Sequence, residues 1–401
     1  MQGQALLAAI VANAPDLTKR RRQFICHMLM LFLSVRSRIN FLQLARHSEQ
    51  YCEHAMRLNF ERQADLATMN RRLVEQHGSG HYVLALDASW LPKSGKATPG
   101  VGKYWSGTAQ KALWGLEACL LSVIDVDNHT AWHLDAVQTP GPDEREAKGI
   151  SLVDHYVQVV AWQAENCLAL SRYLAADAYF AKAGFVERVG RAGLHLVSRL
   201  RKDARLRYLY RGPRSGKPGR PREFDGKVNL AKPDLDYFAL SHRDEQVVVY
   251  SAVVNCPFLG RNIKLAYTQY LDADGQPRNY KLYFSTDLAL PGWVIAKYYR
   301  LRYQQEFLIR DAKGFTGLSD CQARSINKID THLNLALSAV NVAKVEQGVS
   351  ADQPFSIEEA KVLHHNQLLL DRFIAILPKS VELDKNDPKV RELYTFGCKA
   401  A

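Results

Sequence analysis

The stretch Tyr82–Asp87 (YVLALD) decides the fold, because it is a short apolar run that ends at an acid. A second run of the same kind, Tyr173–Asp177 (YLAAD), follows later in the chain. Short apolar runs of this sort are typical of strands in the centre of a sheet. An open sheet gathers residues at its strand ends, so two such aspartates can lie side by side. The runs therefore predict a central sheet with Asp87 and Asp177 at one edge.

Strand and helix patterns surround these two runs. Leu113–Ile124 and Thr130–Val137 are apolar segments on either side of the turn-forming cluster Asp125–His129, which predicts a β-hairpin. Helical periodicity covers Arg145–Leu168, and a further helix and strand are expected between residues 180 and 199. The mixture of strands and helices predicts an α/β fold.

Residues 200–285 follow a different pattern. Alternating segments at 246–255, 261–271 and 279–285 are separated by turn signals such as Asp272–Pro277 (DADGQP). We therefore expect a β-rich insertion that interrupts the α/β core.

Both ends of the chain are predicted to be helical. Two short helices at Asn40–Arg46 and Glu49–Phe60 form either a helix-turn-helix or an ordinary scaffold pair. The apolar run Phe24–Val35 follows a basic cluster, as in a signal peptide, but it contains His27 and lacks a cleavage site. We expect it to be a buried helix, and no segment is a membrane candidate. The amphipathic segment Ile357–Leu377 is expected to pack on the body or on a partner.

The chain carries excess positive charge, and the excess is concentrated. The formal net charge is +12 and the isoelectric point about 9.3. Residues 188–232 contain fourteen Lys or Arg side chains against three acids. A focused basic patch indicates a nucleic-acid partner more than a diffuse basic surface does. Seven scattered cysteines without a C-x-x-C pair indicate reduced intracellular thiols.

Four residues within Pro291–Lys313 have the spacing Y-x2-R-x3-E-x6-K: Tyr299, Arg302, Glu306 and Lys313. On one continuous α-helix they fall in a sector about 60° wide and about 21 Å long. Such a stripe suits an enzyme that lays a nucleic-acid strand across a metal site. The alternative is a solvated helix with ordinary ion pairs.

Glu306 on a helix packed across the strand ends would add a third carboxylate to Asp87 and Asp177. Three clustered carboxylates repel one another unless hard cations lie among them, and Mg²⁺ favours such oxygen ligands together with phosphate. Two ions a few Å apart activate an attacking hydroxyl and stabilise the leaving oxygen of a phosphodiester. A single aspartate after a strand is weak evidence, because Asp also starts turns and caps helices.

Two lysine- and arginine-rich segments are candidates for DNA contact. In the basic loop (residues 211–222), Lys217–Arg222 (KPGRPR) is similar to the core of an AT-hook, which lays arginines in a narrow minor groove. General phosphate contact and a plain linker are the alternatives. The candidate contacts in this loop are Arg211, Arg214, Lys217, Arg220 and Arg222. Lys93 and Lys96, with Lys103 and Lys111, form either a second basic rim or a solvated loop.

The chain resembles DDE transposases of bacterial insertion sequences, in the subgroup with a Tyr-Arg-Glu-Lys signature helix and a β-rich insertion domain. The similarity covers roughly residues 80–345. Its matching segments are Leu84–Ser89 (LALDAS), Lys93–Lys96 (KSGK), Gly102–Gly107 (GKYWSG), Gly115–Asp125 (GLEACLLSVID), Ala175–Tyr179 (AADAY), the basic loop and the four signature residues.

This resemblance implies an RNase H-like catalytic core, a mixed sheet flanked by helices, interrupted by the β-rich insertion. The implied regions are a helical N-terminal DNA-binding region (1–78), the core in two parts (79–200 and 287–347), the insertion (201–286) and a helical C-terminal region (348–401). It implies Asp87, Asp177 and Glu306 as catalytic ligands of two Mg²⁺ ions, with Mn²⁺ as a substitute. Tyr299, Arg302 and Lys313 would hold the transposon-end DNA.

The implied activity is that of a Mg²⁺-dependent endonuclease and DNA strand transferase in the cytoplasm, associated with the bacterial nucleoid. It cleaves double-stranded DNA at terminal inverted repeats and joins the freed 3′-hydroxyl to target DNA, acting as a homodimer on DNA. A domesticated DNA-binding regulator and another RNase H-like nuclease remain alternatives. The three acids argue against the regulator.

One departure concerns excision through a DNA hairpin, in which members of the subgroup often stack a tryptophan of the insertion on a flipped base. Residues 200–285 contain no Trp, and Trp293 just beyond them is expected in the core. Tyr208 or Tyr210 could stack instead. The hairpin step is therefore not assigned.

Overall fold

The computed structural model describes residues 9–12, 14, 17–213, 220–348, 350, 352, 355–378 and 387–398. The chain divides into two compact units. Unit 1 comprises residues 1–81, 88–150 and 304–401, and unit 2 comprises residues 82–87 and 151–303. Strand β1 (Tyr82–Pro92) contributes its first six residues to unit 2 and the remainder to unit 1.

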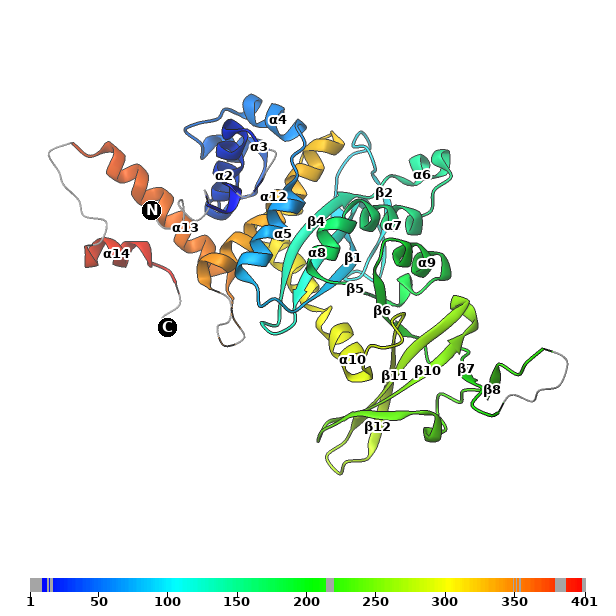
Figure 1. Cartoon of the computed structure of the whole chain (residues 1–401). Coiled ribbons are helices and arrows are strands. Elements are labelled where there is room, and N and C mark those ends of the chain that lie inside the picture. Colours follow the sequence, from blue (N-terminus) through cyan, green and yellow to red (C-terminus); the bar gives the residue numbers. More distant parts are fainter. Residues whose placement is uncertain are drawn as a thin grey trace. The chain divides into compact units, whose positions relative to one another are not determined.

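Unit 1 combines a small antiparallel sheet with a helical bundle (Figure 1). Besides the end of β1, it contains α2 (Lys19–Ser34), α3 (Phe41–Arg46), α4 (Glu53–Glu61), α5 (Leu66–His77), β2 (Gly102–Ser106), β3 (Lys111–Asp125), β4 (Thr130–Gln138), α6 (Pro142–Lys148), α11 (Gln304–Phe315), α12 (Ile326–Gln347), α13 (Ile357–Ile376) and α14 (Pro388–Tyr394). The first part of β3 pairs with β2 and its second part with β4. This pairing confirms the hairpin expected around Asp125–His129.

Helix α12 closes the free edge of β4. Three amide groups of the strand donate to side chains of the helix at 2.8–3.0 Å: His133 to Asn341, Ala136 to Asn334, and Gln138 to Asp330. Two main-chain carbonyls of β4 accept from the same two asparagine side chains. An uncovered edge would leave these backbone groups without partners, so the polar positions of α12 are required by its place in the fold.

Unit 2 contains the parallel strands and the β-rich insertion. Its elements are the start of β1, α7 (Leu152–Trp162), α8 (Ala164–Leu170), β5 (Tyr173–Ala176), η1 (Ala178–Phe180), α9 (Ala183–Arg191), β6 (His195–Leu200), β7 (Arg207–Leu209), β8 (Phe224–Lys227), η2 (Leu235–Tyr237), β9 (Ala239–Arg243), β10 (Val247–Cys256), η3 (Pro257–Leu259), β11 (Arg261–Leu271), β12 (Pro277–Ser285) and α10 (Gly292–Leu301). The strand order is β1-β5-β6-β12-β11-β10-β7-β8, and β9 pairs with the first half of β10, before the residues that pair with β7.

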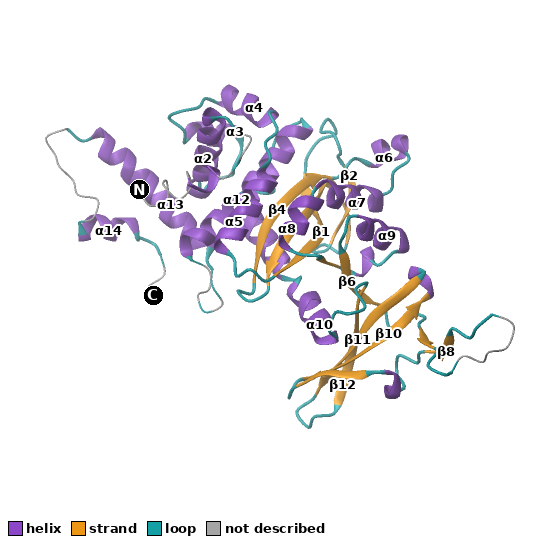
Figure 2. Ribbon diagram, in the orientation of Figure 1, coloured by secondary structure: helices purple, strands orange, loops and turns teal. Residues whose placement is uncertain are grey.

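The insertion continues the same sheet. Strand β12, which ends the insertion, pairs with β6, which precedes it, so that Leu282 lies opposite Leu200. Figure 2 shows β10, β11 and β12 side by side, with helix α10 next to them. The β-rich pattern of residues 246–285 is therefore confirmed as three long antiparallel strands.

The fold class predicted from the sequence is confirmed: mixed strands are flanked by helices in an α/β arrangement. The apolar run Phe24–Val35 lies almost entirely within α2, and most of its side chains are buried. Among the described residues, no helix combines the length and apolar character that a membrane crossing requires. The division into five functional regions stays a prediction.

Candidate active site

Asp87 and Asp177, the first two predicted carboxylates, each come directly after a pair of facing residues on two parallel strands. Strands β1 and β5 pair in parallel, with Leu84 opposite Leu174 and Leu86 opposite Ala176. The next residue in each chain segment is Asp87 or Asp177. Adjacent strands lie about 4.8 Å apart, and residues at the same register position share a face of the sheet. The sequence prediction that these two acids are neighbours is thus supported by the register.

The predicted end of the first strand was wrong. Strand β1 continues past Asp87 to Pro92, whereas β5 ends at Ala176. The continuation Ala88–Pro92 contains a further buried leucine, Leu91, so β1 is longer than its uniformly apolar run. Asp177 caps the short helix η1, and its carboxylate accepts from the Tyr179 amide at 2.7 Å.

Arg302 holds the carboxylate of Asp87. Its Nη1 lies 3.3 Å from Oδ2 of Asp87, and the two side chains are only 13% and 28% exposed. A guanidinium in this place offsets the charge of a partly buried carboxylate. Arg302 therefore contacts the candidate catalytic acid as well as being a candidate DNA ligand.

Tyr299 packs against strand β12 within unit 2. Its ring lies 4.9 Å from the ring of Tyr283, and the Arg302 guanidinium lies 5.9 Å from its centroid. Burial raises the pKa of Tyr299, the positive charges of Arg302 and Arg199 act to lower it, and Asp177 acts to raise it. The phenol therefore keeps its proton at neutral pH and can donate a hydrogen bond.

The continuous signature helix expected from the sequence is wrong, because the helix is interrupted. Helix α10 ends at Leu301 with Arg302 as its C-cap, and α11 begins at Gln304. The side chains on either side have different partners: Arg302 binds Asp87, whereas Gln305 donates to the Leu120 carbonyl and to Ser122. The boundary between the two compact units falls at this break.

Glu306 and Lys313 lie on α11 in unit 1. Glu306 is in the first turn and is exposed, next to the fully buried Gln305 that anchors the helix start. A carboxylate in the first turn is favoured by the helix dipole. Nζ of Lys313 donates to the main-chain carbonyl of Trp90 at 2.9 Å. Lys313 therefore has a structural contact in addition to its predicted role at the DNA end.

The described cations of the basic loop have partners within the chain. Arg220 pairs with Glu223 at 2.9 Å, Arg222 pairs with Asp225 at 3.3 Å, and Arg211 donates to the carbonyls of Asp236 and Tyr237. Arg214 and Lys217 lie outside the described residues. The proposed minor-groove contact of this loop stays a prediction.

Three other expectations can be compared with the structure. Lys93 is half-buried and donates to the carbonyls of Cys321 and Ala323, and burial lowers its pKa, whereas Lys96 is exposed. Tyr208 is buried and one face of its ring already stacks on Tyr237, with 4.1 Å between centroids. Trp293 is 43% exposed, so the expected core position was wrong. Its helix turns the neighbouring Gly292 inward against Ser251 instead.

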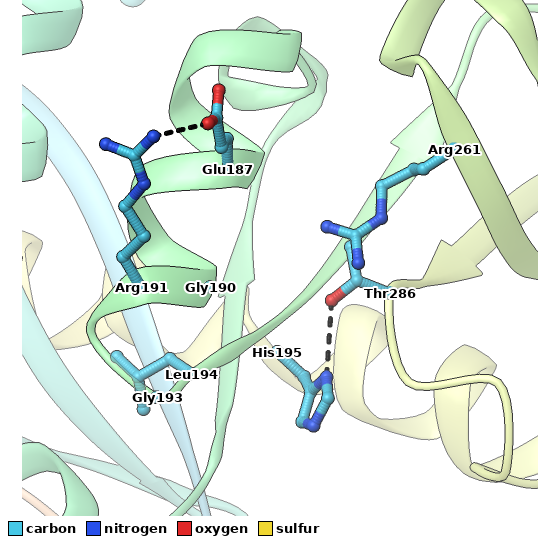
Figure 3. Close-up of a pocket in the computed structure, with 8 residues that line it drawn as sticks. All are labelled: Glu187, Gly190, Arg191, Gly193, Leu194, His195, Arg261 and Thr286. Atoms are coloured by element: carbon cyan, nitrogen blue, oxygen red, sulfur yellow. Dashed lines mark hydrogen bonds and ion pairs between the residues drawn. The ribbon is translucent and has the colours of Figure 1, made fainter.

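Unit 2 also contains a pocket with a volume of 440 Å³ at the opposite end of β5 and β6 from Asp177 (Figure 3). It is lined by Glu187, Gly190, Arg191, Gly193, Leu194, His195, Arg261 and Thr286. Arg191 pairs with Glu187 at 2.6 Å. None of the predicted catalytic residues lines this pocket, so it does not belong to the candidate active site.

The donor chemistry of the aspartate pair fits a hard divalent cation. Both side chains offer carboxylate oxygens from the same register level, and both are partly accessible. The part of the chain that the structure describes contains no assembled group of three or more His, Cys, Asp or Glu side chains suited to a metal ion. The two aspartates are thus the metal-ligand candidates that unit 2 supplies.

Residues 14–240 match the family described as DDE superfamily endonuclease, which covers more than half of the chain. The chain belongs to the DDE superfamily of endonucleases. Residues 146–342 also match the transposase DDE domain. Both matches contain Asp177, and the second contains Glu306. No curated protein matches the chain.

Membership of the DDE superfamily indicates a nuclease-type enzyme with DNA as its substrate. Such domains generally use divalent metal ions. The sequence reasoning missed two residues near Tyr299, namely Arg199 and Tyr283. Arg199 lies within the basic stretch 188–232, so its charge was visible in the sequence, but its proximity to Tyr299 depends on the β6–β12 pairing.

Proposed function

We propose that this DDE endonuclease is the transposase of an insertion sequence. It binds terminal inverted repeats, cleaves the DNA ends and joins the freed 3′-hydroxyl to target DNA by a cut-and-paste route. The observation that carries the proposal is the parallel register of β1 and β5, which continues into Asp87 and Asp177. The match to the transposase DDE domain supports the same reaction class.

In this proposal, Asp87, Asp177 and Glu306 hold two Mg²⁺ ions, for which Mn²⁺ can substitute. When bound, the ions supply activation of the attacking hydroxyl and stabilisation of the leaving oxygen. Carboxylate oxygens are the ligands that Mg²⁺ prefers, and substrate phosphate completes its coordination. The tetrad spacing Y-x2-R-x3-E-x6-K supports the choice of Glu306 as the third acid.

The remaining members of the tetrad bind and orient the DNA end. Tyr299 keeps its proton and donates to a phosphate oxygen, and Arg302 positions the Asp87 carboxylate while facing the DNA backbone. Lys313 contributes a further positive charge. Chemistry at two DNA ends requires two active sites, so the functional form on DNA is a homodimer.

The proposal is tested by incubating the full chain and its Glu306→Gln variant with DNA that carries the element's terminal repeats, in Mg²⁺. We expect the variant to lose cleavage by about 10³-fold or more and to keep DNA binding near wild type, because only a metal ligand is removed. Asp177→Asn should behave in the same way. Glu165→Gln, which changes an exposed acid on α8, serves as the matched control and should cleave normally.

Persistent cleavage by Glu306→Gln would contradict the site assignment. Absence of any cleavage by the wild-type chain, with tight binding retained, would contradict the enzymatic function and favour a DNA-binding regulator. Cleavage of branched DNA or RNA–DNA hybrids without preference for the repeats would favour another RNase H-like nuclease.

A further inference from the structure

The hairpin formed by β2 and β3 in unit 1 presents a row of aromatic and basic side chains on one face. Its register places Lys103 opposite Trp114 and Trp105 opposite Ala112. Alternate residues of a strand point to opposite faces, and directly opposed residues share a face. Both tryptophans and Lys103 therefore lie on the same face, with the tryptophans in diagonal positions.

These two tryptophans are unusually accessible. Trp105 is 60% exposed and Trp114 is 43% exposed, whereas Tyr104 between them on the other face is buried. Large aromatic side chains normally bury most of their surface, because exposed apolar area is unfavourable in water. Two exposed indoles on one strand pair form an apolar patch, and such patches mark interaction sites.

The base of the hairpin is held rigidly. Gly102 and Gly115 lie opposite each other there. A Cβ on Gly115 would come within 2.3 Å of the Leu91 carbonyl oxygen, so at this point β3 approaches β1 more closely than a side chain would permit. The Tyr104 hydroxyl donates toward the carbonyls of Gly100 and Pro140, at 2.8 and 3.2 Å.

One of the two indoles is also fixed in orientation. The Trp114 Nε1–H donates to the Gly95 carbonyl at 3.1 Å. This bond ties the hairpin to the loop that carries Lys96. Little side-chain freedom is therefore lost when a flat partner stacks on this ring.

The segment that carries the two indoles contains lysines but no acid, and the acids that act on the neighbouring Tyr104 are Glu117 and Glu144 from outside it. No acid occurs between residues 88 and 116, and Lys96, Lys103 and Lys111 are all exposed. Within the described residues, no ion pair involves these three ammonium groups. A purely apolar partner would not require this charge, whereas a polyanion with flat apolar rings matches both properties.

We propose that the Trp–Lys hairpin (residues 102–115 with Lys96) is a stacking platform for unpaired DNA bases. Trp105 and Trp114 stack on bases exposed at a nicked, frayed or overhanging DNA end, and Lys103 on the same face, with Lys96 beside it, binds the adjoining phosphates. Base–aromatic stacking needs an unpaired base, because paired bases are already stacked in the duplex. This inference rests on the proposed function in that DNA is taken as the substrate.

The test uses a DNA duplex with a four-nucleotide overhang that contains 2-aminopurine, and the same duplex without an overhang, in EDTA so that no cleavage occurs. We expect the wild-type chain to bind the overhang DNA more tightly and to quench the 2-aminopurine. Trp105→Ala and Trp114→Ala should each weaken binding of the overhang DNA by about 5- to 100-fold and reduce the quenching. Trp105→Phe should restore most of the affinity, because a phenyl ring still stacks.

Trp162→Ala is the matched control, because Trp162 is 62% exposed on α7 outside the hairpin. It should bind both DNAs like the wild type. Circular-dichroism melting of each variant separates lost stacking from lost folding. Equal affinity of the wild type for both DNAs would overturn the proposal, as would unchanged quenching in Trp105→Ala and Trp114→Ala.

Sedimentation of the same variants tests another occupant. Unchanged DNA binding combined with altered self-association would assign the hairpin to a protein interface and overturn its role as a base platform. Because the readouts need no cleavage, failure of the stacking proposal is distinguishable from failure of the proposed transposase activity.

Discussion

The two cationic surfaces of the chain differ in whether their charges are available. The basic loop is rich in arginine, but its described arginines pair with nearby acids or donate to main-chain carbonyls. The Trp–Lys hairpin carries fewer cations, and no ion pair involves Lys96, Lys103 or Lys111 within the described residues. Each charge that is already paired contributes less to phosphate binding, because binding must first break or weaken the internal pair.

The difference shows that net charge along a sequence overstates how many unpaired positive charges a basic segment offers. Residues 188–232 have the larger excess of Lys and Arg, so the sequence favours them as the main DNA surface. The structure adds partners such as Glu223 and Asp225, which lie within the same stretch. The hairpin has less charge but also two exposed indoles, and so offers two kinds of contact to a nucleic acid.

The largest expected effect concerns the contacts that hold the segment before β2 of the Trp–Lys hairpin. The side-chain amide of Gln138 donates to the Pro99 carbonyl, and the main-chain N–H of Gln138 donates to the Asp330 carboxylate. Loss of water around Asp330 raises its pKa from 3.8 to about 7. Between these pH values the folded state keeps a proton that the unfolded state has lost, so stability falls as the pH rises from about 4 to about 7.

Asp330→Asn removes this titration and keeps an acceptor for the Gln138 amide. Between pH 4 and pH 7, we expect the free energy of unfolding of the wild type to fall by about 2–4 kcal/mol relative to the variant. The melting temperature of the wild type should fall by about 5–10 °C relative to that of the variant over the same range. The difference should stay constant above pH 7. A constant difference across the whole range, measured by calorimetry, would show that the carboxylate is ionised throughout.

Gly115→Ala tests the close strand approach at the hairpin base. The added methyl group would meet the Leu91 carbonyl and the Trp90 indole, at 2.3 and 2.6 Å, so the strands must separate. We expect a loss of about 2–3 kcal/mol in stability and weaker binding of overhang DNA. Gly107→Ala at the hairpin tip, where nothing lies within 4 Å, is the control and should change stability by less than about 0.5 kcal/mol.

Charge removal compares the two surfaces directly. Replacement of Lys96, Lys103 and Lys111 by Gln should weaken duplex binding by about 10- to 100-fold and lower the salt slope by up to about 2.7. Replacement of Arg211, Arg220 and Arg222 by Gln should have a smaller effect on both quantities, measured by fluorescence anisotropy across a salt series. An equal or larger effect of the arginine replacements would break the distinction between available and paired charge.

The smallest expected effect is a gain. Glu223→Gln removes the partner of Arg220, which leaves its guanidinium available to a phosphate. We expect duplex affinity to increase by about 2- to 5-fold at low salt, because the exposed pair is weak. Unchanged affinity in Glu223→Gln would mean that the loop does not contact the DNA.

Much of the fold follows from local sequence patterns. The run Tyr173–Ala176 is a strand with the predicted bounds, and the apolar segments around Asp125–His129 form the predicted hairpin. The parallel pairing of β1 with β5 explains why two apolar runs ending in aspartate were informative: their register carries the two acids to the same level. Periodicity and composition were sufficient there, because burial of both sheet faces imposes an unbroken apolar run.

The features that the sequence does not reveal depend on contacts between distant segments. The signature helix is interrupted between Leu301 and Gln304, and neither a proline nor a glycine marks the break in the sequence. Trp293 is a residue type that is usually buried, but helix α10 turns the adjacent Gly292 inward instead. The partners of Lys93 come from residues 321 and 323, far along the chain. No local pattern could predict these contacts.

In unit 2, the hydrogen-bonded strands from β5 to β8 fix the distance between Asp177 and the basic loop along the sheet. Six strand spacings of about 4.8 Å separate the strand that precedes Asp177 from the strand that follows the basic loop, or roughly 29 Å along the sheet. At about 3.4 Å per base pair, this corresponds to about eight base pairs of duplex. Because neighbouring strands of this ladder are hydrogen-bonded, the number of strands in the insertion sets the spacing between Asp177 and the basic loop, and under the proposed function it would set how far from the cleavage site the loop meets the DNA.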